Sequence, residues 1–137
     1  MASLLWGLVY VLCERLYAHV HVTTVLAAIS FVAFIGMSLF GLARGTLGSD
    51  LQIIASSKSI LLLTIAVTLV FMMAELCIGF SISGRNATLA ALIEISYPFF
   101  TALFAAVLFR ENYLSVSVLV GGLFIMFGVM IISIFNY

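Results

Sequence analysis

Three carboxylates interrupt the apolar runs of this 137-residue chain: Glu14, Glu75 and Glu94. A charged side chain at the centre of a bilayer costs roughly 2.5–3.5 kcal/mol, whereas one Leu, Ile, Phe or Val recovers only about 0.3–0.6 kcal/mol. A carboxylate inside a membrane helix therefore usually faces a cavity, where it could bind a cation or exchange a proton. The alternative is structural: a hydrogen bond between helices or, for Glu14 beside Arg15, a position near a helix end that reaches water.

Each carboxylate shares a helical face with aromatic or hydroxyl residues, at steps of three and four along the chain. Aromatic rings could contact cations or ring systems, and hydroxyl groups could donate hydrogen bonds. The alternative for these neighbours is ordinary helix packing. The candidate substrate- and proton-binding residues are Glu14, Tyr10, Trp6, Thr68, Glu75, Glu94 and Tyr97.

Other residues could shape the helices that carry these groups. Pro98 removes one backbone hydrogen bond and predicts a kink close to Glu94. Asn86, just before an apolar run, is a typical helix N-cap. A seam of small residues in the last apolar run predicts close helix packing, within the bundle or in a dimer: Gly121, Gly122 and Gly128.

The composition requires a membrane around these elements. The chain is 66% hydrophobic and only 7% charged, whereas a soluble domain carries about 25% charged residues. A helix needs about 20 apolar residues to cross the bilayer. We therefore predict an all-α integral membrane protein with one domain, residues 1–137, and five transmembrane helices. Their expected ranges are 2–20, 25–43, 59–83, 87–109 and 113–135.

The connections between these helices follow from the polar residues. Short polar turns at 84–86 and 110–112 predict antiparallel neighbours. The break within 19–24 is marked by His and Thr rather than by Gly or Pro, so a short re-entrant first segment is the alternative to a first span. Residues 44–58 form the longest expected loop, and part of it could lie along the membrane interface.

Several classes of function find no support in the sequence. There is no HExxH motif, no Gly-rich phosphate loop and no Cys/His metal spacing, so we expect neither an enzyme nor a cofactor or metal. The formal net charge is zero, and nothing predicts nucleic-acid binding.

Two segments resemble the last helical hairpin of the drug/metabolite transporter superfamily, especially EamA-like domains. These are AALIEISYPFFTALFAAVLFREN (90–112) and LVGGLFIMFGVMIIS (119–133). The opening LLWGLVYVL (4–12) resembles the first helix of that domain. The resemblance implies one five-helix repeat, half of a ten-helix fold whose two repeats have opposite orientations. Small multidrug resistance proteins, which are four-helix relatives, place a Glu of their first helix at the substrate and proton site, and Glu14 is similar in placement.

The leading hypothesis is a subunit of a secondary active transporter for a small metabolite or an amphipathic or cationic compound, coupled to protons and working as a dimer. Its partner would be an inverted second copy or a similar five-helix protein, because the charges on the two sides of the membrane nearly balance. The expected location is a bacterial or archaeal cytoplasmic membrane. The alternatives are a non-transporting scaffold or regulatory subunit and a component of a lipid-linked-sugar flippase.

Overall fold

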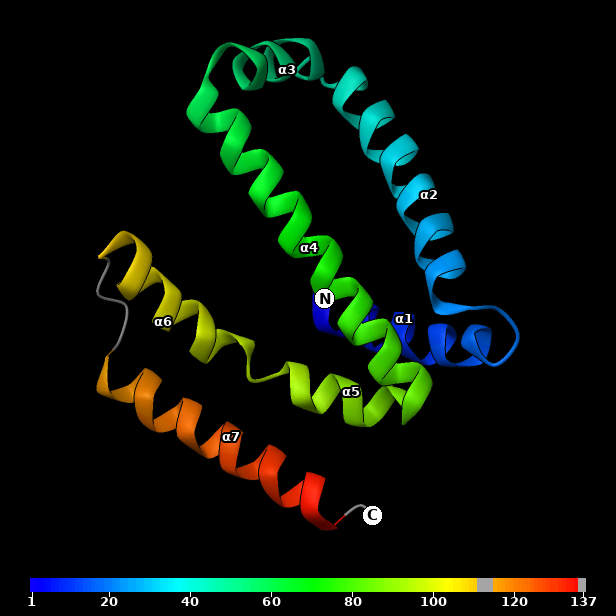
Figure 1. Cartoon of the computed structure of the whole chain (residues 1–137), viewed down its shortest axis with the longest axis vertical. Helices are drawn as coiled ribbons and strands as arrows, with labels where there is room; N and C mark the ends of the chain where they lie inside the picture. Colours follow the sequence, from blue (N-terminus) through cyan, green and yellow to red (C-terminus); the bar gives the residue numbers. More distant parts are fainter. Residues whose placement is uncertain (111–114, 136–137) are drawn as a thin grey trace.

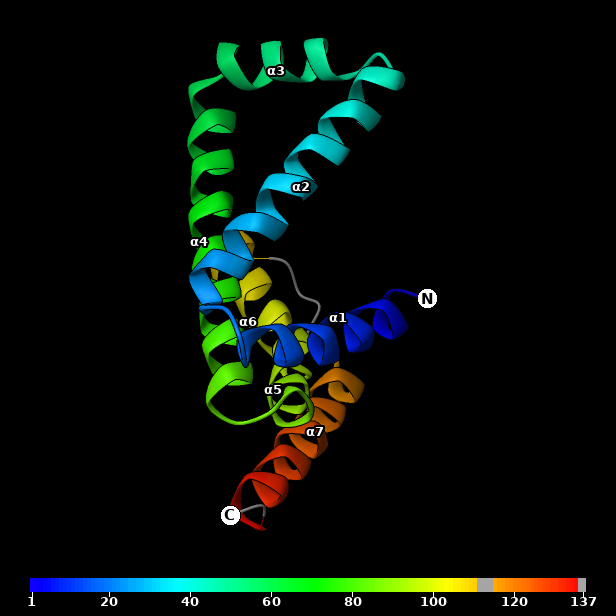
Figure 2. The same cartoon turned by 90° about the vertical axis from the view of Figure 1, so that its right-hand side faces the viewer.

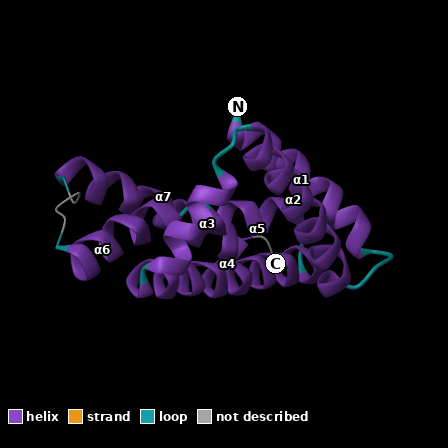
Figure 3. Cartoon of the chain, turned by 90° about the horizontal axis from the view of Figure 1, so that it is seen from above, coloured by secondary structure: helices purple, strands orange, loops and turns teal. Residues whose placement is uncertain are grey.

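The computed structural model describes residues 1–110 and 115–135, and it folds them into helices joined by short loops (Figures 1 and 3). In chain order the helices are α1 (Ala2–Tyr17), α2 (Val22–Ala43), α3 (Leu47–Ser56), α4 (Lys58–Gly84), α5 (Ala87–Glu94), α6 (Tyr97–Phe109) and α7 (Val116–Phe135). The expected all-α class is confirmed.

Four segments of the described chain are long and apolar enough to cross a membrane: Val22–Ala43, Lys58–Gly84, Ala87–Phe109 and Val116–Phe135. The prediction of five spans is therefore not confirmed. Helix α1 has 16 residues and is about 24 Å long, which is shorter than the hydrocarbon core of about 30 Å. It crosses α4 at a steep angle (Figures 1 and 2).

The bounds of α2 follow from its two caps. His21 accepts a hydrogen bond from the backbone N–H of Thr23 through Nδ1, at 3.4 Å, so α2 begins three residues before the expected position 25. At its other end Gly45 adopts a positive φ of 72°. The N–H groups of Gly45 and Thr46 bond to the carbonyls of Leu42 and Gly41, which is the Schellman arrangement that ends many helices.

The prediction of a loop at 44–58 is wrong over most of this range, because α3 occupies Leu47–Ser56. Apolar residues recur at helical spacing along α3. The prediction of a loop rested on the Gly and Ser content and did not use this pattern. Ser57 then ends α3 and caps α4 by accepting from the N–H of Ile60, at 3.5 Å. Helix α3 spans the separated ends of α2 and α4 (Figures 1 and 2).

Helices α2 and α4 converge at their other ends, and Gly79 makes this approach possible. A Cβ atom added at Gly79 would lie 2.7 Å from Cγ1 of Val22 and 3.3 Å from Cδ1 of Leu26. Only glycine fits such a distance without displacement of a neighbour. Helices α2, α3 and α4 thus form a triangle whose corners are all in contact (Figure 1).

The expected helix 87–109 is divided in two. Helix α5 ends at Glu94, and α6 begins at Tyr97 with Pro98 in its first turn. Because proline has no backbone N–H, it cannot continue the hydrogen-bond ladder from α5. The interruption lies where the sequence predicted a kink, and it sets α6 and α7 on the side of α4 remote from α2 (Figures 1 and 3).

The surface of the chain is large and apolar. Its solvent-accessible area is 10654 Å², whereas a compact soluble protein of 14.8 kDa exposes about 7,000 Å². Leu, Ile, Val, Phe and Met side chains supply much of this excess. Such a surface is stable against lipid tails or another apolar protein face rather than water.

Candidate substrate cleft

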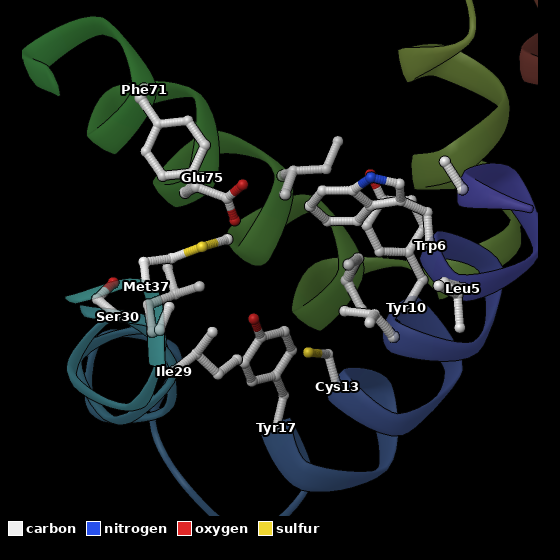
Figure 4. A pocket seen from close by; sticks show the side chains of 16 residues that line it. Leu5, Trp6, Tyr10, Cys13, Tyr17, Ile29, Ser30, Met37, Phe71 and Glu75 are labelled. Atoms are coloured by element: carbon white, nitrogen blue, oxygen red, sulfur yellow. The ribbon is translucent and has the colours of Figure 1, made fainter. Parts of the chain in front are cut away.

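A cleft of about 500 Å³ lies between α1, α2 and α4 (Figure 4). Helix α1 provides one wall with Leu5, Trp6, Tyr10 and Tyr17, while Ser30 and Met37 are among the residues that α2 contributes. Ligand pockets usually have volumes of about 300–1,000 Å³. The cleft can therefore hold a small organic molecule.

Glu75 is the charged residue among those that line this cleft. Its side chain is half-buried on α4, and its carboxylate points into the cleft between α1 and α2 (Figure 4). Phe71, one helical turn earlier, lines the same wall. The cleft thus combines one carboxylate with an aromatic and aliphatic lining.

The rings of α1 face this carboxylate across the cleft. Trp6 and Tyr10 contact each other with ring centroids 5.7 Å apart, and the hydroxyl of Tyr17 points toward the side of Glu75 (Figure 4). A Cβ atom added at Gly79 would lie 3.3 Å from that hydroxyl oxygen. The structure therefore brings together three predicted site residues, Trp6, Tyr10 and Glu75, and adds Tyr17.

Glu14 does not line the cleft, although it lies one helical turn from Tyr10 on α1. Its carboxylate oxygen Oε2 accepts a hydrogen bond from the backbone N–H of Ala87, at 3.0 Å. Asn86 accepts from the N–H of Leu89 at 2.8 Å, which confirms its predicted role as a cap. Two of the four unsatisfied N–H groups at the start of α5 are thereby bound by side chains.

Glu94 is also separate from the cleft, although Tyr10 connects the two. The hydroxyl of Tyr10 donates a hydrogen bond to Oε2 of Glu94, while the ring of Tyr10 lines the cleft. Glu14 and Tyr10, one helical turn apart, therefore tie α1 to the first and last residues of α5. Ala90, between those residues, is fully buried against α1 and α4.

The remaining candidates lie elsewhere. Thr68 is exposed, and its hydroxyl donates to the carbonyl of Thr64 one turn earlier. Tyr97 is 62% exposed at the start of α6. Neither residue lines the cleft.

The glycines of α7 divide into two kinds. Gly122 is buried, and a Cβ atom placed there would lie 2.8 Å from Cδ2 of Phe99 on α6. Gly121 and Gly128 have open space at the same position. Gly122 therefore permits the contact within the hairpin, while a role for Gly121 and Gly128 in assembly stays a prediction.

Among the described residues, no cluster of three or more His, Cys, Asp or Glu side chains could hold a metal ion. The chemistry of the cleft therefore comes from one carboxylate, aromatic rings and hydroxyl groups. Together with the apolar spanning helices, this defines a multi-pass membrane protein with a cleft of ligand size.

Comparison with known proteins gives the family. The EamA-like transporter family matches residues 1–134. The chain belongs to this family and is an integral, multi-pass membrane protein of the transporter type, which confirms the resemblance seen in the sequence. No curated protein and no solved structure matches the chain.

Proposed function

We propose that this chain is a subunit of a secondary active transporter for a small metabolite or an amphipathic cation, with Glu75 as the residue that binds substrate and proton. The observation that carries the proposal is the half-buried carboxylate of Glu75 in an apolar cleft of about 500 Å³. Ionisable groups inside a membrane protein usually mark the path of a substrate or an ion.

The chemistry of the cleft favours a cation with an apolar body. The negative charge of Glu75 attracts a positive group, and the faces of Trp6 and Tyr17 can stabilise it through cation–π contacts. Leu26, Ile29 and other aliphatic residues provide apolar contact for the rest of the molecule. An anionic substrate would meet like charge in a medium of low dielectric constant.

One carboxylate also provides a simple route to proton coupling. It can neutralise a single positive charge, so a proton and a monovalent cation compete for it. A subunit that reorients only when Glu75 is neutralised, by either of them, exchanges one for the other across the membrane. The substrate gradient and the proton gradient are then linked through a single side chain.

The same geometry supports a dimer. Helices α1, α2 and α4 form walls of the cleft, whereas no described residue of α5, α6 or α7 lines it. Many transporters build a binding site at mid-membrane from two inverted repeats. In this proposal the second repeat is another copy of the chain in the opposite orientation, or a similar protein.

The test is proton flux in proteoliposomes, driven by candidate substrates. Wild-type protein should release protons when organic cations are added, and Glu75→Gln should lose this response at least tenfold while still inserting into the membrane. Asp50→Asn, the same chemical change at an exposed carboxylate of α3, is the control and should behave as wild type.

Full proton flux in Glu75→Gln would overturn the assignment of this residue. A protein silent toward every compound class would favour the scaffold or regulatory alternative. A response restricted to lipid-linked sugars would favour the flippase component.

A further inference from the structure

A second hollow adjoins the cleft. This hollow has a volume of about 360 Å³ and lies between α2, α4 and the start of α3, where Leu47 lines it. Four residues line both spaces: Ser30, Ala33, Met37 and Phe71. The carboxylate-bearing cleft and the second hollow therefore adjoin each other at these side chains.

The two spaces differ in polarity. The difference is one of charge: the cleft contains the carboxylate of Glu75, whereas the second hollow is lined by apolar residues and two serines, Ser30 and Ser38, with no charged side chain among the described residues. A molecule that occupied both would therefore need a polar end and an apolar end.

The place where the two spaces adjoin has a structural cause. Helices α2 and α4 touch at Gly79 and diverge toward α3 (Figure 1). On the α2 side of the opening, the small residues Ser30 and Ala33 are one turn apart, and Met37 follows one turn later. Methionine has an unbranched, flexible side chain that adapts to different neighbours.

We infer that the substrate is a single-chain amphiphile, with its cationic head at Glu75 and its apolar tail passing beside Ala33 into the second hollow. This inference rests on the proposed function, since it takes Glu75 as the head site. It adds a second recognition element, which selects substrates by the length of the tail. Each methylene moved from water into an apolar site strengthens binding about fourfold, so a tail that fills this hollow makes a large difference in affinity.

The experiment compares butyl-, octyl- and dodecyltrimethylammonium binding to protein in phosphatidylcholine nanodiscs. Ser38→Trp fills the second hollow, because Ser38 lines that hollow and not the cleft. It should weaken binding of the octyl and dodecyl compounds at least tenfold and leave the butyl compound within twofold of wild type. Glu75→Gln should weaken all three compounds by a similar factor, because it alters only the head site.

Val32→Trp is the matched control. Val32 lies on the same helix as Ser38, is 68% exposed and lines neither space. It should leave all three affinities unchanged. Since each compound enters the bilayer to the same extent with every variant, partition into lipid cancels in the comparison.

Two results would overturn the inference alone. Ser38→Trp without effect on any compound would place the tail in the surrounding lipid, and equal weakening of all three compounds would place the head, not the tail, beside Ser38. If none of the compounds binds wild-type protein, the proposed cation site fails as well.

Discussion

At the residue scale, the three carboxylates of the apolar helices have three different surroundings. Glu75 faces the cleft, Glu14 accepts from a backbone N–H at the start of α5, and Glu94 accepts from Tyr10. Of the three, Glu75 is the one that lines the cleft. The other two satisfy hydrogen bonds that join α1 to α5, which is the structural role that the sequence left open as an alternative.

Glu14 allows a direct test of that structural role. Glu14→Ala removes the acceptor for the N–H of Ala87, and loss of such a cap costs about 0.5–2 kcal/mol. Thermal unfolding in mild detergent should therefore begin at a lower temperature. Glu14→Gln keeps an amide oxygen at the same place and should stay close to wild type. Equal destabilisation by both substitutions would show that the charge, and not the hydrogen bond, matters.

The sequence predicted part of this site and could not predict the rest. Trp6 and Tyr10 share a face of α1 at a spacing of four, and both line the cleft. Thr68 shares a helical stripe with Glu75, yet it is exposed. In a membrane protein both the packed and the lipid-facing sides of a helix are apolar, so periodicity indicates which residues share a face without indicating where that face points.

At the element scale, the starts and ends of the spanning helices were the most predictable features. All four spans found among the described residues agree with the expected ranges to within three residues, since polar turns mark where apolar runs end. Helix α1 is the exception: its apolar run is interrupted by Glu14 and Arg15, and it ends at Tyr17. The contact of Gly79 with Val22 was not predictable, because it joins helices whose relative position depends on α3.

Gly79 gives the prediction at this scale. In the middle of an exposed helix, Gly→Ala is favourable by about 1 kcal/mol, so Gly36→Ala, with open space around the added carbon, should stabilise the protein or leave it unchanged. Gly79→Ala should destabilise it, because the new carbon meets the stiff, buried side chain of Val22. Overpacking of this kind costs about 1–3 kcal/mol.

The measurement is the detergent-solubilised melting temperature of both variants. We expect the melting temperature to fall for Gly79→Ala and to rise or stay unchanged for Gly36→Ala. A Gly79→Ala protein as stable as Gly36→Ala would mean that α2 and α4 do not approach each other closely at this point.

At the scale of the whole molecule, the division among the α7 glycines separates folding from assembly. Gly128→Leu adds bulk where the chain itself leaves open space, so it should lower the oligomer mass without lowering the melting temperature of the subunit. Gly122→Leu should lower the melting temperature, because it collides with Phe99. Light scattering in mild detergent provides the mass, and unchanged mass for Gly128→Leu would make that glycine irrelevant to assembly.

Orientation is the second prediction at this scale. Alternation of the four spans places Arg44, Lys58 and Arg110 on one side, with Arg15 and Arg85 on the other. Three positive charges against two give almost no bias for the positive-inside rule. We therefore expect individual subunits to insert in both orientations, as an antiparallel homodimer requires.

Single cysteines at 48 and 84, in a background with Cys13→Ala and Cys77→Ala, report the orientation. Position 48 lies in α3, between the spans α2 and α4, and position 84 lies at the end of α4, so the two are on opposite sides of the membrane; both are open to an added side chain. Dual topology predicts that each cysteine reacts with an impermeant thiol reagent from both faces of the membrane. Strictly one-sided labelling would exclude the homodimer and leave a partner protein of fixed orientation.

The triangle of α2, α3 and α4 has a mechanical consequence. Because each of these three helices contacts the other two, the angles between them cannot change unless a helix bends or a contact separates. The gap between α2 and α4 therefore keeps a fixed width, set by the length of α3 and the joint at Gly79. A movement that opens or closes the cleft would therefore have to displace α1. Helix α5 would move with α1, because the hydrogen bonds of Glu14 and Tyr10 connect the two helices. For the proposed amphiphile, the fixed gap would then limit the thickness of the tail that can pass between α2 and α4, whatever the position of α1.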